Sequence, residues 1–216
     1  MKLLLIRHGE TPWNLDGRYQ GRSDPPLTPR GEDQARALAQ SLAQSLAQGL
    51  TSAQATRLVA GPLQRAQATA RAIGAAAGLP VDVDPRLTEL SYGAWEGLRQ
   101  AEVKLRWPEL LRQWKRQPDQ ACLPGGESLA ALQQRVRSFM DDAAAGSGTT
   151  VAVTHAGVIR AMVLEASGAP LAAFRAVRID NATLTTLCAR HGRWWVRAIG
   201  VPGRPYCTRC ASSPLA

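Results

Sequence analysis

The sequence Leu3-Leu4-Leu5-Ile6-Arg7-His8-Gly9-Glu10-Thr11 lies almost at the start of the chain and indicates both a strand and a site. Its apolar first half predicts a short buried β-strand. That strand ends in Arg7 and His8, which places a guanidinium and an imidazole at the carboxyl edge of a sheet, where open α/β folds bind ligands. An arginine at such an edge indicates an anion, and the histidine beside it indicates chemistry.

Length and composition indicate one domain. The chain has 216 residues, of which 45% are hydrophobic, enough to bury one full core. We expect a single domain over residues 1–201 and an irregular tail over residues 202–216, where prolines recur. The apolar start is too short for a signal peptide and no later run is long enough to span a bilayer, so we expect a cytoplasmic protein without a membrane partner.

The formal net charge of +9 raises the question of nucleic-acid binding. The arginines are dispersed along the chain, lysine occurs only at positions 2, 104 and 115, and no recognition motif accompanies the charge. We therefore expect a small phosphorylated metabolite, and not a nucleic acid, as the partner, and leave a homodimer open.

The cysteines do not predict a metal site. They stand at positions 122, 188, 207 and 210, and the Cys207-x-x-Cys210 pair lacks two further ligands at a spacing typical of zinc modules. We expect free thiols, no metal and no cofactor.

Strand-like and helix-like segments alternate along the chain, which predicts an α/β fold with a mostly parallel central sheet and helices on both faces. The expected strands are residues 3–6, 57–60, 81–83, 150–154, 177–179, 183–188 and 194–199. The expected helices cover residues 31–49, a segment ending at 73, 98–114, 129–142 and 158–166, and residues 12–29 and 90–97 are expected to be loops.

Two histidines occupy equivalent places in this pattern. His8 and His155 each follow a buried strand and precede a turn that contains glycine. Arg7 and Arg65 also lie at carboxyl ends of expected strands, so the four side chains can converge on one anion. Planar guanidinium groups match the oxygens of a tetrahedral phosphate.

Five motifs occur in order between residues 3 and 165. They are Arg7-His8-Gly9-Glu10-Thr11 with Asn14, Pro62-Leu63-Gln64-Arg65-Ala66 with Thr69-Ala70, Leu87-x-Glu89 with Gly93-x-Trp95-Glu96-Gly97, Gly126-Glu127-Ser128, and Val153-Thr154-His155-Ala156-Gly157. Together they resemble the histidine phosphatase, or phosphoglycerate mutase-like, superfamily. The resemblance implies a three-layer sandwich.

The resemblance also implies roles for individual residues. His8 would be the nucleophile that forms a phosphohistidine, with its other ring nitrogen held by a backbone carbonyl. Arg7, Arg65 and His155 would bind the phosphoryl oxygens. Glu89 would protonate the leaving group and then activate water, with Glu10 and Glu96 as weaker alternatives for this role.

Secondary contacts to the phosphate would come from Asn14, Gln20, Gly21 and the backbone of Ala156. The chain departs from the family pattern at two places. Gly61 stands where a serine is usual, which we expect to loosen that loop, and Ala156 stands where a glycine is common.

The segments after Glu89 indicate which reaction and which substrate to expect. Glu89 and His155 are 66 positions apart, too close for the insertion that mutases of the superfamily carry, which favours a phosphatase. A phosphoglycerate mutase, a broad-specificity phosphatase and a catalytically silent binding protein remain alternatives. The Gly126-Glu127-Ser128 motif and residues 197–201 resemble α-ribazole phosphatases, so we expect α-ribazole 5′-phosphate as substrate. We expect the loop from Trp95 to Trp114, with Trp107, Tyr92 and Trp13, to form an aromatic wall for its ring-bearing leaving group.

Overall fold

A computed structural model describes residues 1–47 and 55–202 of the chain. Its centre is a six-stranded sheet in the order β3-β2-β4-β1-β5-β6. The strands are β1 (Lys2–Arg7), β2 (Ala55–Ala60), β3 (Val81–Val83), β4 (Thr149–Thr154), β5 (Thr183–Arg190) and β6 (Arg193–Pro202). The first four pair in parallel and β5 and β6 are antiparallel, which confirms the mostly parallel α/β sheet.

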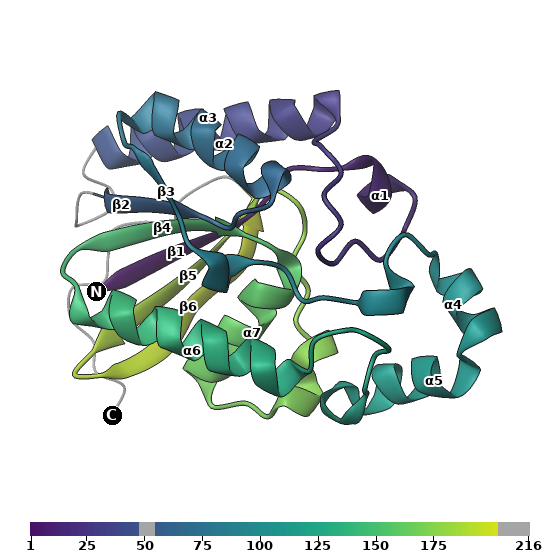
Figure 1. The fold of residues 1–216 in the computed structure, drawn as a ribbon. Helices are drawn as coiled ribbons and strands as arrows, with labels where there is room; N and C mark the ends of the chain where they lie inside the picture. The colour runs from purple at the N-terminus through teal and green to yellow at the C-terminus, as the bar shows by residue number, and fades with distance from the viewer. Residues whose placement is uncertain (48–54, 203–216) are drawn as a thin grey trace.

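Helices cover both faces of this sheet and give three layers (Figure 1). On one face lie α2 (Pro29–Ala47) and α3 (Gln64–Ala77), and on the other lie α6 (Leu129–Ala145) and α7 (Ala156–Ser167). Strand β1 serves both layers, because Leu3 and Leu5 belong to the core under α6 and α7 while Leu4 and Ile6 belong to the core under α2 and α3. A continuous apolar run fits such a strand, since both of its faces are buried.

The remaining helices lie at the end of the sheet to which the parallel strands run (Figure 1). These are α1 (Pro12–Leu15), α4 (Gln100–Arg106) and α5 (Pro108–Arg116). Short 3₁₀ turns join the elements at Pro85–Leu87, Gly93–Trp95, Pro118–Gln120 and Leu171–Arg175.

Three expectations about these segments were wrong. The single helix expected over residues 98–114 is two helices, because Trp107 has φ −139° and ψ 63° and Pro108 starts a new helix without an N–H. The segment 12–29 is not all loop, since it contains α1. Residues 177–179 form no strand, because the carbonyls of Val177 and Ile179 accept hydrogen bonds from arginine side chains and not from a neighbouring strand.

Other differences concern boundaries. Helix α7 begins at Ala156, two residues before the expected start, and β6 runs through Pro202, which we had placed in the tail. Cys122 is exposed, Cys188 is buried and neither is in a disulfide, whereas Cys207 and Cys210 lie outside the described residues. Within residues 1–47 and 55–202, no helix is long and apolar enough to cross a membrane.

We predict that Trp114→Ala lowers the free energy of unfolding by about 3–5 kcal/mol, the range for removing a buried aromatic side chain. Trp114 is 4% exposed, and its ring centroid lies 5.9 Å from Tyr92, 6.3 Å from Trp95 and 6.0 Å from Phe174. Chemical denaturation measures the loss. The control is Trp195→Ala on β6, which removes a side chain that is 44% exposed, and an equal loss in both variants would contradict the prediction.

Candidate active site

The pairing of β1 with β4 brings the two histidines together. Arg7 is in register with Thr154, and the amide of His8 donates to the carbonyl of Thr154 at 3.0 Å. His8 and His155 therefore leave neighbouring strands at the same level, and their ring centroids are 5.1 Å apart. Both side chains are buried, as expected for the floor of a site and not for its rim.

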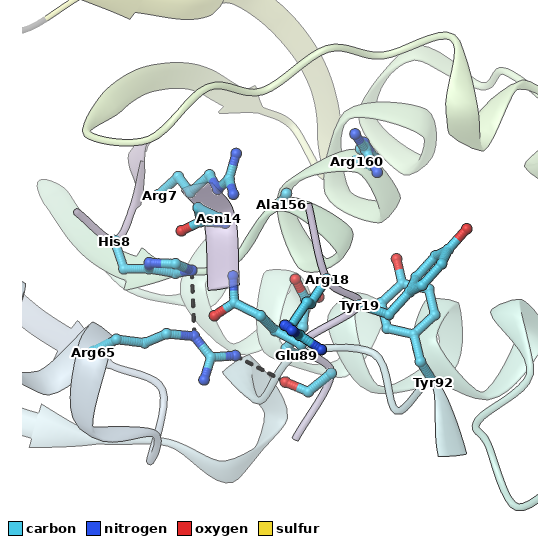
Figure 2. A pocket seen from close by; sticks show the side chains of 12 residues that line it. Arg7, His8, Asn14, Arg18, Tyr19, Arg65, Glu89, Tyr92, Ala156 and Arg160 are labelled. Atoms are coloured by element: carbon cyan, nitrogen blue, oxygen red, sulfur yellow. Dashed lines mark hydrogen bonds between the residues drawn. The ribbon is translucent and has the colours of Figure 1, made fainter. Parts of the chain in front are cut away.

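The ring of His8 is held in one orientation and one tautomer. Its Nδ1 lies 2.7 Å from the carbonyl oxygen of Gly9, which can only accept, so Nδ1 carries the proton. Its Nε2 accepts from Nε of Arg65 at 3.3 Å, the contact drawn as a dashed line in Figure 2. Burial and the charges of Arg7 and Arg65 lower the pKa of His8 well below its usual value. The imidazole is therefore neutral at pH 7, with the lone pair on Nε2.

Arg65 is fixed at the start of α3 by backbone carbonyls. Its Nη2 donates to the carbonyl of Gly21 at 2.8 Å and its Nη1 to that of Ser23 at 2.7 Å, with a longer contact of 3.4 Å to Asp24. The side chain is 1% exposed, and burial lowers its pKa. Because its two short hydrogen bonds go to neutral carbonyls and its ion pair with Asp24 is long, the guanidinium is oriented mainly by groups that do not cancel its charge.

Arg7 is held in a similar way by the segment that precedes β5. Its Nη1 donates to the carbonyl of Ile179 at 2.7 Å, and its buried Nε has no hydrogen-bond partner among the described residues. Burial lowers the pKa of Arg7 to about 10, with partial compensation from Glu89, so the group is still cationic at neutral pH.

Glu89 is 8% exposed and is bound to the start of α7. Its Oε2 accepts from the amide of Gly157 at 3.2 Å and its Oε1 from its neighbour, the amide of Leu90, at 2.8 Å. A Cβ at position 157 would lie 2.4 Å from Oε1 of Glu89, so a glycine is required for this approach. The carboxylate thereby reaches the cavity that contains His8.

His155 differs from His8 in that both of its ring nitrogens are buried and neither finds a hydrogen-bond partner within residues 1–47 and 55–202. Burial, Arg65 and His8 lower its pKa well below the usual value, so this imidazole is also neutral. Buried polar atoms without partners are uncommon in proteins and call for an explanation such as a ligand.

His8, the two arginines and Glu89 line a cavity of about 170 Å³ (Figure 2). It is lined by Arg7, His8, Asn14, Arg18, Tyr19, Gln20, Gly21, Arg65, Glu89, Tyr92, Ala156 and Arg160. The structure thus gathers every expected site residue around one cavity except His155, which does not line it but packs against the ring of His8.

Three residues that line the cavity were not expected from the sequence: Arg18, Tyr19 and Arg160. Arg160 was detectable, because it stands four residues after Ala156 and hence on the same face of the helix. The expected aromatic wall is mostly wrong, since Tyr92 lines the cavity but Trp13 and Trp107 do not, and Trp107 packs against the core.

Asn14 and Gln20 are not free loop side chains. Oδ1 of Asn14 accepts from the amide of Thr11 at 3.0 Å, which closes a capping box on α1, and Oε1 of Gln20 accepts from the hydroxyl of Thr11 at 2.9 Å. Thr11 therefore sets the position of both.

The two alternative carboxylates lie outside the cavity. Glu10 accepts from the hydroxyl of Thr28 at 3.0 Å and lies 3.8 Å from Arg30. Glu96 accepts from the amides of Arg22 (3.1 Å), Ser23 (2.9 Å) and Tyr92 (3.1 Å). Glu96 thereby ties the loop that holds Arg65 to the loop after Glu89.

In the part of the chain that the structure describes, no group of three His, Cys, Asp or Glu side chains is placed to bind a metal ion. The expected loosening at Gly61 is also not seen, because a Cβ there would lie 2.7 Å from the carbonyl oxygen of Leu87. The glycine allows close packing at this point.

The chain belongs to the histidine phosphatase superfamily. The model of branch 1 of this superfamily matches residues 3–202.

Individual relatives carry different names. Phosphoserine phosphatase 1 of Hydrogenobacter thermophilus is 36% identical over 189 residues, covering 87% of this chain and 86% of the relative. A probable phosphoglycerate mutase of Yersinia enterocolitica is 34% identical over 201 residues, covering 90% and 87%. Among solved structures, a putative α-ribazole-5′-phosphate phosphatase of Escherichia coli has a TM-score of 0.82 and 28% identity, covering 95% of this chain and 98% of its own.

We predict that Glu96→Gln lowers the free energy of unfolding by about 1–2 kcal/mol at pH 7, because the amide nitrogen cannot accept from Ser23. Burial alone would raise the pKa of Glu96, but the hydrogen bonds from Arg22, Ser23 and Tyr92 lower it overall. The ionised form therefore stabilises the fold above the pKa of an unfolded glutamate, and this contribution is lost as the pH falls through the lower folded value.

Denaturation at several pH values measures this effect. The difference between wild type and Glu96→Gln should shrink below about pH 4. A difference that is constant from pH 7 to pH 3 would contradict the prediction.

Proposed function

We propose that this protein is a cytoplasmic phosphomonoester hydrolase that acts on a small phosphorylated metabolite through a phosphohistidine at His8, without a nucleic-acid or membrane partner. The observation that carries the proposal is the hydrogen bonding of His8, whose Nδ1 lies against the carbonyl of Gly9 while Nε2 accepts from Arg65 beside a cavity that Arg7 also lines. A lone pair on a neutral imidazole is the nucleophile that such a reaction requires.

The first step transfers the phosphoryl group to the enzyme. Nε2 of His8 attacks phosphorus, the bond to the leaving oxygen breaks, and protonated Glu89 gives its proton to that oxygen. Arg7 and Arg65 bind the remaining phosphoryl oxygens, where positive charge stabilises the transition state. His155, neutral and packed against His8, contributes a ring N–H to one of these oxygens. The second step is hydrolysis: Glu89, now ionised, takes a proton from water, the oxygen attacks phosphorus, and phosphate leaves His8.

We propose further that no metal takes part. The two buried guanidinium groups supply the positive charge that Mg²⁺ supplies in many phosphoryl transfers, and carbonyls orient them without neutralising them.

For the substrate, the sequence resemblance and the E. coli structure support α-ribazole 5′-phosphate, and a specific observation favours a second candidate. Beyond the phosphate-facing groups the cavity is lined by Arg18 and Arg160, and Arg160 makes no ion pair with any described carboxylate. The volume of about 170 Å³ is below the roughly 300–1,000 Å³ of sites that enclose drug-sized ligands. A small leaving group that carries a carboxylate, as in phosphoserine, fits these features.

We predict phosphate release from at least one ester in a panel of α-ribazole 5′-phosphate, phosphoserine, 3-phosphoglycerate and p-nitrophenyl phosphate, at the same rate with and without chelator. His8→Ala should lose at least about 1,000-fold in kcat because the nucleophile is gone. His191→Asn, at the exposed turn between β5 and β6, is the control.

Each alternative has its own outcome in this assay. Isomerised phosphoglycerate without net phosphate release would favour a mutase. An intact fold with no turnover would favour a silent binding protein, and full activity of His8→Ala would exclude the mechanism. Loss of activity with chelator, restored by added Mg²⁺, would exclude metal independence.

We predict that Arg160→Gln separates the two substrate candidates. If Arg160 binds a carboxylate, removing its charge costs about 1.5–3 kcal/mol, so KM for phosphoserine should rise about 10- to 100-fold. KM for α-ribazole 5′-phosphate and for p-nitrophenyl phosphate, whose leaving groups carry no carboxylate, should rise far less. Equal changes for all esters would contradict a carboxylate site.

A further inference from the structure

Asn181 lies in the irregular segment that leads into β5, and its side-chain amide faces the loop after β1. Nδ2 is 3.1 Å from the carbonyl oxygen of His8, 3.2 Å from that of Gly9 and 3.1 Å from Oδ1 of Asn14. Backbone carbonyls only accept, and Oδ1 of Asn14 already accepts from Thr11. The NH₂ group of Asn181 is therefore the end that must face them.

The backbone on either side fixes this segment to the end of β1. The amide of Ala182 donates to the carbonyls of Arg7 (3.1 Å) and His8 (3.2 Å), and the carbonyl of Ile179 accepts from the side chain of Arg7. Ala182 has φ +52°, in the left-handed region that residues other than glycine seldom adopt. Such a conformation persists where surrounding contacts hold it, as these do.

One of the three contacts leads directly to the nucleophile. The Gly9 oxygen accepts from Nδ2 of Asn181 and also from Nδ1 of His8 at 2.7 Å, so its two lone pairs serve two donors. Because Nδ2 has two hydrogens and three acceptors, one N–H is shared between two of them. The direction of the Gly9 carbonyl acts together with Nε of Arg65, which donates to Nε2 of His8 at 3.3 Å, to keep the proton on Nδ1 and Nε2 unprotonated.

We propose that Asn181 is a positioning residue for the reaction: it keeps the Gly9 carbonyl aimed at Nδ1 of His8 and so holds the nucleophile in its reactive tautomer. Asn181 touches neither phosphate nor leaving group and acts through Gly9 and Asn14. The inference rests on the proposed phosphohistidine mechanism for its effect on rate, but its effect on the histidine ring is independent of turnover.

The mechanism also gives the expected kinetic signature. When Nε2 binds phosphorus the ring becomes cationic, and the hydrogen bond from Nδ1 to Gly9 becomes a stronger, charge-assisted one. Interactions that strengthen in the transition state raise kcat more than substrate affinity. A residue that only stabilised the fold would not produce this difference.

The test uses Asn181→Asp, which has the same shape but no NH₂ group, and Asn181→Ala, which removes the contacts without adding charge. Arg178→Ala is the control in the same segment, because Arg178 is exposed and pairs only with Asp180 among the described residues. The chain has three histidines, so ¹⁵N-histidine labelling, with His8→Ala for assignment, reports the protonation of each ring nitrogen by NMR.

In wild type and Arg178→Ala, Nε2 of His8 should be unprotonated and Nδ1 protonated at pH 7. In folded Asn181→Asp and Asn181→Ala, a population protonated at Nε2 should appear. A misplaced nucleophile should lower kcat about 10- to 100-fold with KM changed less than threefold. If the Asp variant does not fold, the Ala variant supplies both readouts.

An unchanged His8 spectrum in a folded Asn181 variant overturns the proposal, whatever happens to activity. Equal changes in kcat and KM also overturn it, since they would indicate a structural role. If wild type hydrolyses no ester, the proposed function fails, while the NMR comparison still decides whether Asn181 controls the tautomer of His8.

Discussion

The parallel pairing of β1 with β4 is the constraint on which the site depends. The β1–β4 register, continued past Arg7 by the hydrogen bond from the amide of His8 to the carbonyl of Thr154, sets two histidines from distant parts of the sequence beside each other. A slip of one residue in this register would turn the side chains of β1 to the opposite faces of the sheet and dismantle both cores at once. The apolar residues of β1 and β4 thus determine the geometry of the site as well as the stability of the fold.

A second constraint is the burial of two cationic side chains next to the cavity. Arg7 and Arg65 are buried, which is costly for a cation, and the chain holds them mainly with the carbonyls of Gly21, Ser23 and Ile179. Carbonyl dipoles satisfy the donors and leave the net charge in place, whereas carboxylates would cancel it. The neutral ring of His8 accepts from Arg65, and the neutral ring of His155 packs against that of His8. The positive charge of the two arginines is therefore available to an anion that enters the cavity.

The sequence predicts a feature of this site where neighbouring residues in the chain mark it. The pattern of strands placed Arg7, His8, Arg65 and His155 at one edge of the sheet, and the resemblance to the family added Glu89. Asn181 could not be found in this way, because its partners are more than 160 positions away and no local pattern marks them. Residues 177–179 form no strand because side chains, and not a neighbouring strand, bind their carbonyls: Arg7, 172 positions away, binds Ile179, and Arg160 binds Val177. No pattern within the segment itself marks either contact.

The approach of Glu89 to the start of α7 has a consequence for the evolution of the chain. Position 157 touches no substrate in the mechanism, yet any side chain there would occupy the place of the carboxylate. Substitution at position 157 is therefore limited by the space that the Glu89 carboxylate occupies and not by contact with the substrate. A library that diversifies the leaving-group side of the cavity can vary Arg18, Tyr19 and Arg160, but it should keep Gly157 constant.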